Sequence, residues 1–218
     1  MKKPNICASI INSDIEAIKA VEPLVELFEV RIDLIGEGWQ DIARQLEKPW
    51  IACNRTKEEG GNWRESEARR KEELLKAIQL GAGIVDIELA TPNLEKVVPL
   101  VKKQAKCLLS FHNIKQTPPL ENLKKVVKQQ LAAGADICKV VTCAQNAEDN
   151  LTILKLIPEF PGVNIIAFAI GLIGLPSRIL SPLVGGYLTY AAIEKGTQSA
   201  PGQMTVNELH NLYQMVKQ

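Results

Sequence analysis

Short apolar runs typical of buried β-strands alternate eight times with stretches of helical periodicity along this chain of 218 residues. The apolar runs lie near residues 6–11, 27–35, 50–55, 83–89, 106–112, 136–142, 163–170 and 187–193. The helical stretches cover residues 14–26, 38–47, 64–80, 93–104, 120–133, 147–157, 174–184 and 204–217. Regular alternation of strand and helix predicts a parallel sheet with crossover helices. At roughly 27 residues per unit, the pattern predicts an α/β fold, a (β/α)8 TIM barrel near the lower size limit of that architecture.

The chain contains no Gly/Ser/Pro-rich linker and no block of like charge that would divide it. We therefore expect residues 1–218 to form a single barrel domain. An open doubly wound sheet is the alternative, but no G-x-G-x-x-G motif follows an early strand.

Composition and charge bound the class of partner. Hydrophobic residues make up 46% of the chain, charged residues 23%, and the formal net charge is +1. These values give no electrostatic reason to expect nucleic acid or an anionic membrane. The opening Met1-Lys2-Lys3-Pro4 lacks the long apolar region of a secretory signal, and the apolar stretch at 165–175 is too short to span a bilayer. We expect a cytoplasmic protein that acts on a small molecule.

Cysteine and histidine usage does not suggest a metal site. The five cysteines form no C-x-x-C pair, and four of them lie inside predicted strands, so we interpret them as reduced and buried. The two histidines, His112 and His210, have no Cys or His neighbours at metal-ligand spacing. We therefore expect no metal.

Charged residues occur at every second position of the run "FEVRIDLI". Because strand side chains alternate between two faces, Glu29, Arg31 and Asp33 would all point the same way. A half-exposed antiparallel strand with a solvated face is one interpretation. In a barrel, the same pattern predicts a polar interior.

Two strands carry residues suited to acid/base and nucleophilic chemistry. His112 ends the fifth predicted strand, and Lys139 lies in the middle of the sixth, within "ICKVV". Neighbouring strands lie about 4.8 Å apart, so both side chains can reach one substrate. Burial near Arg31 or Arg55 would lower the pKa of Lys139 and free its amine as a nucleophile. The alternative is an ion pair between Lys139 and an interior carboxylate such as Glu29.

Polar loop residues follow three other predicted strands. Arg55 and Glu59 precede Gly60-Gly61 after the third strand, where solvated loop charges are the alternative interpretation. Arg178 follows the seventh strand, and Ser199 and Gln203 follow the eighth. Loops at the last two positions of a barrel often hold phosphate, whereas an arginine fork fits a carboxylate equally well.

Taken together and in this order, these motifs resemble type I 3-dehydroquinate dehydratase over nearly the whole chain. The matching segments are Glu29-x-Arg31-x-Asp33, Arg55-x-x-x-Glu59-Gly60-Gly61, Ser110-Phe111-His112, Lys139-Val140, Ser177-Arg178 and Ser199-Ala200-Pro201-Gly202-Gln203. Each motif is weak alone, but six in register are specific.

The resemblance implies a cofactor-free lyase of the shikimate pathway of aromatic amino acid biosynthesis, which dehydrates 3-dehydroquinate to 3-dehydroshikimate through a lysine Schiff base. By this resemblance, Lys139 is the Schiff-base lysine and His112 the general acid/base, oriented by Glu59. Arg178 matches the arginine that binds the substrate carboxylate. Members are often homodimers.

The resemblance also implies further substrate contacts. Glu29, Arg31 and Arg55 match residues around the ring hydroxyls, and Ser199 with Gln203 matches a mobile loop that closes over the substrate. The segment "FAIG" departs from the family, because Ala169-Ile170 stands where a serine-methionine pair is expected. The chain also starts at its first strand, so we expect the barrel bottom to be closed differently from that of longer members.

Two other functions are open on the residues alone. A class I aldolase would also use a barrel lysine, but it requires a phosphate site, and the late loops offer no obvious Gly-rich cradle of backbone amides. A catalytically silent barrel that binds a carboxylate metabolite would show ligand binding without a covalent adduct.

Overall fold

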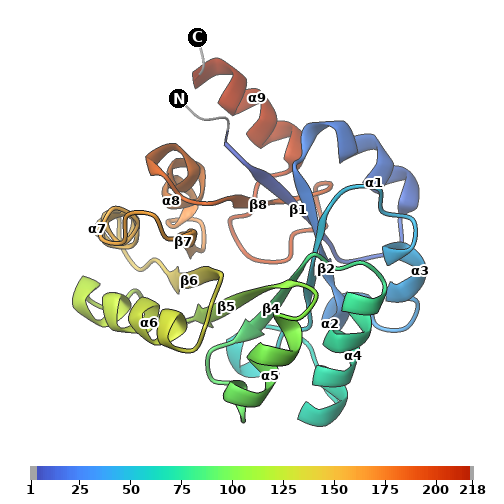
Figure 1. Ribbon diagram of the computed structural model, residues 1–218. Helices are drawn as coiled ribbons and strands as arrows, with labels where there is room; N and C mark the ends of the chain where they lie inside the picture. The colour runs from blue at the N-terminus through green and yellow to red at the C-terminus, as the bar shows by residue number, and fades with distance from the viewer. Residues whose placement is uncertain (1–3, 217–218) are drawn as a thin grey trace.

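Eight parallel strands form one nearly closed barrel in the computed structural model, which describes residues 4–216. The strands are β1 (Ile6–Ile10), β2 (Leu27–Arg31), β3 (Trp50–Cys53), β4 (Ile84–Glu88), β5 (Lys106–His112), β6 (Ile137–Cys143), β7 (Ile165–Ile170) and β8 (Thr189–Ala192). Their order is β7-β6-β5-β4-β3-β2-β1-β8. Figure 1 shows the strands gathered around a common axis with the helices outside. The predicted (β/α)8 barrel is confirmed.

The helices occupy the predicted connections. They are α1 (Ile15–Val21), α2 (Ile32–Ile35), α3 (Trp39–Ala43), α4 (Glu67–Gln79), α5 (Leu94–Val101), α6 (Leu120–Ala132), α7 (Glu148–Lys155), α8 (Leu175–Leu180) and α9 (Val206–Val216). Short 3-10 turns lie at Glu22–Leu24, Lys57–Glu59 and Ser181–Val184. The predicted end of the last helix at residue 217 and the opening residues 1–3 lie outside the described part of the chain. Between residues 4 and 216, no helix is long and apolar enough to cross a membrane.

The predicted strand at 27–35 is wrong in its second half, because the chain turns into helix α2 after Arg31. The ladder with β3 ends at the pair Arg31 and Cys53, so later residues have no strand partner there. The Asp33 carboxylate holds the turn by accepting hydrogen bonds from Arg31 and from the backbone N–H of Asn62. The alternation of apolar residues therefore continues beyond Arg31, although the strand ends there.

The inside of the barrel changes from apolar to polar along the strands. Its lower part is an apolar cluster that contains Cys7, Leu27, Ile51, Ile84, Leu108, Ile137, Ile166 and Leu188. Two residues later on the same strand faces stand Ser9, Glu29, Cys53, Asp86, Ser110 and Lys139. Strand alternation thus makes the lower part of the barrel interior apolar and places the charged side chains above it, toward the carboxyl ends of the strands.

Within residues 4–216 the barrel has one seam, between β7 and β8, where no strand ladder forms. The start of α8 bridges it. Ser177 Oγ accepts a hydrogen bond from the backbone N–H of Ala169 in β7 at 2.9 Å. Thr189 Oγ1 in β8 donates to the carbonyl of Arg178 at 2.9 Å. The seam therefore fixes the position of Arg178.

Candidate active site

A pocket of about 270 Å³ opens at the carboxyl ends of the strands. All of the predicted site residues line it: Glu29, Arg31, Arg55, Glu59, His112, Lys139, Arg178, Ser199 and Gln203. The fold thus brings residues from six strands or the loops after them to one place, as the barrel architecture predicts.

Lys139 lines the pocket and is 5% exposed. Its Nζ is 2.9 Å from Asp86 Oδ2 and 3.4 Å from Glu29 Oε1. The same nitrogen lies 4.3 Å from the centroid of the Tyr190 ring, a cation–π contact. Lys139 is therefore held by two carboxylates and an aromatic face at once.

The predicted lowering of the lysine pKa is wrong. Burial by itself lowers the pKa of Lys139, but Asp86 and Glu29 together raise it above its ordinary value, despite an opposing effect of Arg55. The prediction considered the nearby arginines and did not include Asp86. The amine must therefore lose a proton before it can attack a carbonyl group.

His112 and Glu59 form a hydrogen-bonded pair at the pocket wall. His112 Nδ1 is 2.7 Å from Glu59 Oε2, and the backbone N–H of His112 donates to the same oxygen at 3.1 Å. Burial, together with the positive charges of Arg55 and Lys139, lowers the pKa of His112 well below its usual value. The imidazole is therefore neutral at pH 7, as a general base must be.

Glu59 has an unusually high pKa for a carboxyl group. Burial raises its pKa to about 7, while Arg55 opposes that rise. The arginine Nη1 lies 3.8 Å from Glu59 Oε2. A carboxyl group poised at this pH can hold the imidazole in one tautomer and stabilise the imidazolium that forms when His112 takes a proton.

Arg55 is the centre of a buried charge cluster. It contacts Asp86 at 2.6 Å, Glu88 at 3.0 Å and Ser110 Oγ at 2.6 Å. Neither Asp86 nor Glu88 was among the residues predicted for the site. The signal was present, because "IVDIE" places two carboxylates at alternate positions of an apolar strand, much as "FEVR" places Glu29 and Arg31 at alternate positions of β2.

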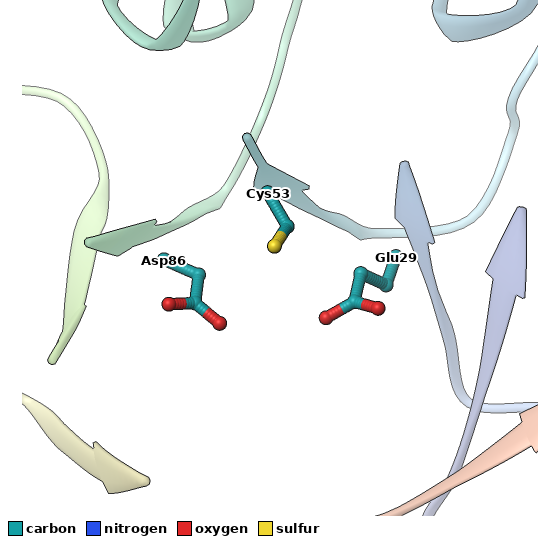
Figure 2. Close-up of side chains that lie close together, drawn as sticks. All are labelled: Glu29, Cys53 and Asp86. Carbon is teal, nitrogen blue, oxygen red and sulfur yellow. The ribbon is translucent and has the colours of Figure 1, made fainter. Parts of the chain in front are cut away.

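Glu29, Cys53 and Asp86 meet inside the barrel, as Figure 2 shows, and come from three adjacent strands. Their ligand atoms lie within 4.8 Å of one another, a spacing that could hold a metal ion. Positive side chains already occupy this place. Lys139 contacts both carboxylates, and Arg55 Nη2 is 2.6 Å from Asp86 and 3.4 Å from Cys53 Sγ. The cluster is therefore charge-compensated by the chain itself.

Arg31 has a bidentate partner within its own segment. Its Nε and Nη2 donate to Asp33 at 2.9 and 2.8 Å, and both residues are buried. Arg31 lines the pocket in a fixed orientation, so it can offer a substrate only the N–H groups that Asp33 leaves free.

Arg178 is different, because it forms no ion pair with any residue in the described range 4–216. It is 3% exposed, its Nε finds no hydrogen-bond partner there, and its guanidinium lies 4.5 Å from the centroid of the Phe168 ring. Burial lowers its pKa to about 10, although Glu29 opposes the shift. A buried cation without a counter-ion, directed at a pocket, is a site for an anion.

The loop after β8 closes one side of the pocket. Gln203 Oε1 accepts hydrogen bonds from the backbone N–H and the hydroxyl of Ser199 at 2.7 and 3.0 Å. Its amide Nε2 donates to Ser9 Oγ at 3.4 Å. The carbonyl of Pro201 accepts from the N–H of Gly171 at 3.1 Å, so the loop rests on the end of β7.

The departure at Ala169-Ile170 places one residue in the pocket and one outside it. Ile170 lines the pocket, whereas Ala169 packs between the sheet and the outer helices. Ile170 therefore supplies an apolar surface to the pocket at the end of β7.

The sequence of this chain is similar to one family of known proteins. Residues 6–218 match the sequence model of the type I 3-dehydroquinase family. A curated 3-dehydroquinate dehydratase from Dehalococcoides mccartyi is 44% identical over 217 residues, which cover 99% of this chain and 97% of that protein. Its counterpart from Methanocaldococcus jannaschii is 34% identical and covers 97% of this chain and 98% of its own.

Solved structures agree with the sequence relatives. The 3-dehydroquinate dehydratase of Geobacillus kaustophilus superposes with a TM-score of 0.87 at 25% identity, over 99% of this chain and 92% of that one. The enzyme from Enterococcus faecalis gives 0.82 at 26% identity, over 99% and 95% of the two chains. This chain therefore belongs to the type I 3-dehydroquinase family.

Proposed function

We propose that this chain dehydrates 3-dehydroquinate to 3-dehydroshikimate through a Schiff base on Lys139. The single observation that supports it best is the placement of Lys139. Its amine lies in a pocket that also contains a neutral imidazole paired with a carboxyl group and a buried arginine that has no counter-ion in the described part of the chain. These are the parts that the resemblance implies for the reaction.

In the proposed first step, Lys139 gives up a proton and its amine adds to the ketone carbon of the substrate. The ketone oxygen takes up the proton that Lys139 gave up and one more from the nitrogen and leaves as water, so that a protonated imine remains. Nitrogen carries one positive charge before and after this step, so Asp86 and Glu29 stabilise both the ammonium and the iminium. The iminium provides the electron sink that the ketone lacks.

His112 would then remove the C2 proton, and the electrons would move onto the imine nitrogen to give a neutral enamine. Return of those electrons expels the C1 hydroxyl, which leaves as water with the proton from His112. Hydrolysis of the remaining iminium releases the product and restores Lys139. General acid/base catalysis of this kind contributes typically ~10²–10⁴-fold.

Substrate orientation would come from the charges around the reacting atoms. Arg178 supplies a guanidinium for the carboxylate, which would give this buried cation a counter-ion. Glu29, Arg31 and Arg55, with Ser199 and Gln203 on the loop, would bind the ring hydroxyls and close the pocket. Ile170 would pack against the ring.

The test is borohydride reduction in the presence of 3-dehydroquinate, followed by mass spectrometry of the intact protein and its peptides. We expect one adduct, on Lys139, and loss of both adduct and turnover in Lys139→Ala. His112→Ala should lose ~10³-fold or more in turnover and still form the adduct slowly. Lys124→Ala, an outer-surface control, should behave like the parent. A folded parent that turns over substrate without an adduct would contradict the proposal.

The same experiment separates the alternatives. A class I aldolase would cleave a carbon–carbon bond of a phosphorylated substrate, and a silent barrel would bind a carboxylate without forming any adduct. A homodimer in the cytoplasm and a single folding domain remain part of the proposal. Sedimentation of the purified chain and the number of its unfolding transitions test the assembly and the domain.

A further inference from the structure

Arg70 is a fully buried cation outside the pocket. It lies near the start of helix α4, is 1% exposed, and makes five hydrogen bonds. Two of them go to Glu67 at 2.7 and 2.9 Å, on the same helix. The others reach the barrel, at Glu88 Oε2, Thr91 Oγ1 and the carbonyl of Asn54.

Glu88 joins Arg70 to the active site. Its Oε2 is 2.6 Å from Arg70 Nη1, and its Oε1 is 3.0 Å from Arg55 Nη1. The backbone N–H of Thr56 also donates to Oε1 at 3.2 Å. One carboxylate is thus shared between two buried guanidinium groups, each of which takes one oxygen.

The chain of contacts continues to the base. Arg55 Nη1 is 3.8 Å from Glu59 Oε2, and that oxygen is 2.7 Å from His112 Nδ1. The charged groups around Glu59 are Arg55 after β3, Asp86 and Glu88 on β4, and His112 on β5. Arg55 favours the ionised form of Glu59, and the two β4 carboxylates oppose it. Burial raises the pKa of Glu59 most, and the balance between Arg55 and the two β4 carboxylates adjusts it.

We propose that Arg70 is a positioning residue for the reaction, because it neutralises Glu88 from behind and leaves the charge of Arg55 available to Glu59. Without Arg70, the full negative charge of Glu88 would fall on Arg55 and, through space, on Glu59. Glu59 would then take up a proton at a higher pH and would no longer stabilise an imidazolium on His112. This inference rests on the proposed function of His112.

A purely structural role predicts a different result. Arg70 also ties α4 to the barrel through Glu88, Thr91 and the carbonyl of Asn54, so its loss must weaken the fold in either case. If Arg70 only held α4 against the barrel, its replacement would lower the melting temperature and leave the pH dependence of catalysis unchanged. The pH profile therefore distinguishes the two roles.

The experiment measures kcat/KM for 3-dehydroquinate dehydration against pH in Arg70→Gln and Arg70→Lys. The ionised form of Glu59 is the active one, so parent activity should rise with pH through about 7, and Glu59→Gln should lack this limb. Arg70→Gln should move the limb upward by about one pH unit, which is roughly a tenfold loss below it. Arg70→Lys keeps the positive charge, so the limb of this variant should lie close to its position in the parent.

Two further variants keep the test decisive. Arg69→Gln is the matched control, because Arg69 lies on the same helix but is exposed and pairs with Glu72 and Glu73; its limb should not move. The double variant Arg70→Gln/Glu88→Gln removes the unbalanced carboxylate and should bring the limb back toward the parent position. An unmoved limb in folded Arg70→Gln, or an equal shift in Arg69→Gln, would overturn the inference. Failure of the proposed function would show separately, as a parent without a borohydride adduct.

Discussion

At the scale of single residues, two buried carboxylates, Asp86 and Glu88, each contact two cations. Asp86 is the clearest case: its carboxylate accepts from Lys139, Arg55 and Ser110 and is fully enclosed. The desolvation that burial imposes is outweighed by these partners, so the pKa of Asp86 lies well below its usual range.

Asp86→Asn should therefore change both stability and the chemistry of Lys139. Removing one partner of a buried ion pair costs about 3–5 kcal/mol, and the loss of a negative charge should lower the pKa of Lys139. Urea denaturation measures the first effect, and the pH dependence of borohydride trapping measures the second. We expect trapping to reach half its maximum at a lower pH than in the parent.

The surface pair of Asp136 with Lys102 supplies a control, since its two side chains are 31% and 39% exposed. Asp136→Asn should cost less than about 1 kcal/mol and leave trapping unchanged. An Asp86→Asn protein with the trapping profile of the parent would show that Asp86 does not set the charge of Lys139.

On the sequence alone, a catalytic Lys139 and an ion-paired Lys139 are alternatives. In the structure, Lys139 forms ion pairs with Asp86 and Glu29. The two are compatible, because a charge that persists from ammonium to iminium needs the same counter-ions throughout. Lys139→Ala should therefore lose stability, because two buried carboxylates lose a partner.

At the scale of elements, the repeated pattern predicted every strand and the main helix between each pair. It could do so because a parallel strand buried on both faces is apolar throughout, and its crossover helix is amphipathic. The boundaries depended on neighbours that a single segment does not contain. Strand β2 ends where its ladder with β3 ends. The contact between Asp86 and Lys139 could not be predicted from either segment alone, because it depends on where β4 lies in the barrel.

The loop after β8 depends on Gly202. Its φ of +76° favours glycine, and a Cβ there would lie 2.3 Å from the carbonyl oxygen of Gly171. Gly202→Ala should push the loop away from β7 and from the pocket, and we expect KM to rise about tenfold or more because the loop residues lose their position. Steady-state kinetics checks this.

Gly196 lies in the same loop region with a φ of +89°, and a Cβ at this position would have no neighbouring atom within 4 Å among the described residues. Gly196→Ala therefore adds backbone strain of about 1 kcal/mol without a collision and should leave KM near that of the parent. Equal kinetics in the two variants would mean that contact with β7 does not position the loop. The predicted mobility of Ser199 and Gln203 stays a prediction; protease sensitivity at Lys195, with and without ligand, would test it.

At the scale of the whole molecule, one continuous sheet and one interior support the expectation of a single domain. The seam between β7 and β8 is the exception to continuity. Tyr187 N–H donates to the carbonyl of Ile165 at 2.7 Å near its lower end, and the start of α8 fills its upper part. The site residues Arg178 and Gln203 lie on the two sides of this seam, on the segments after β7 and β8.

The seam should be the place where the barrel opens first, since a strand edge held by side chains and one short helix has fewer cooperative hydrogen bonds than a ladder. We expect amides in β7 and β8 to exchange with deuterium faster than those in β3, β4 and β5, as mass spectrometry of peptides can measure. A bound substrate carboxylate would neutralise Arg178 and contact the loop that carries Gln203, so it should slow exchange at the seam more than elsewhere. Ser177→Ala removes the hydrogen bond to β7 and should speed exchange in β7 selectively. Exchange that starts at β1 and β2, or protection by ligand that is uniform around the barrel, would show that the seam is as stable as the ladders and does not couple the site to the closure of the barrel.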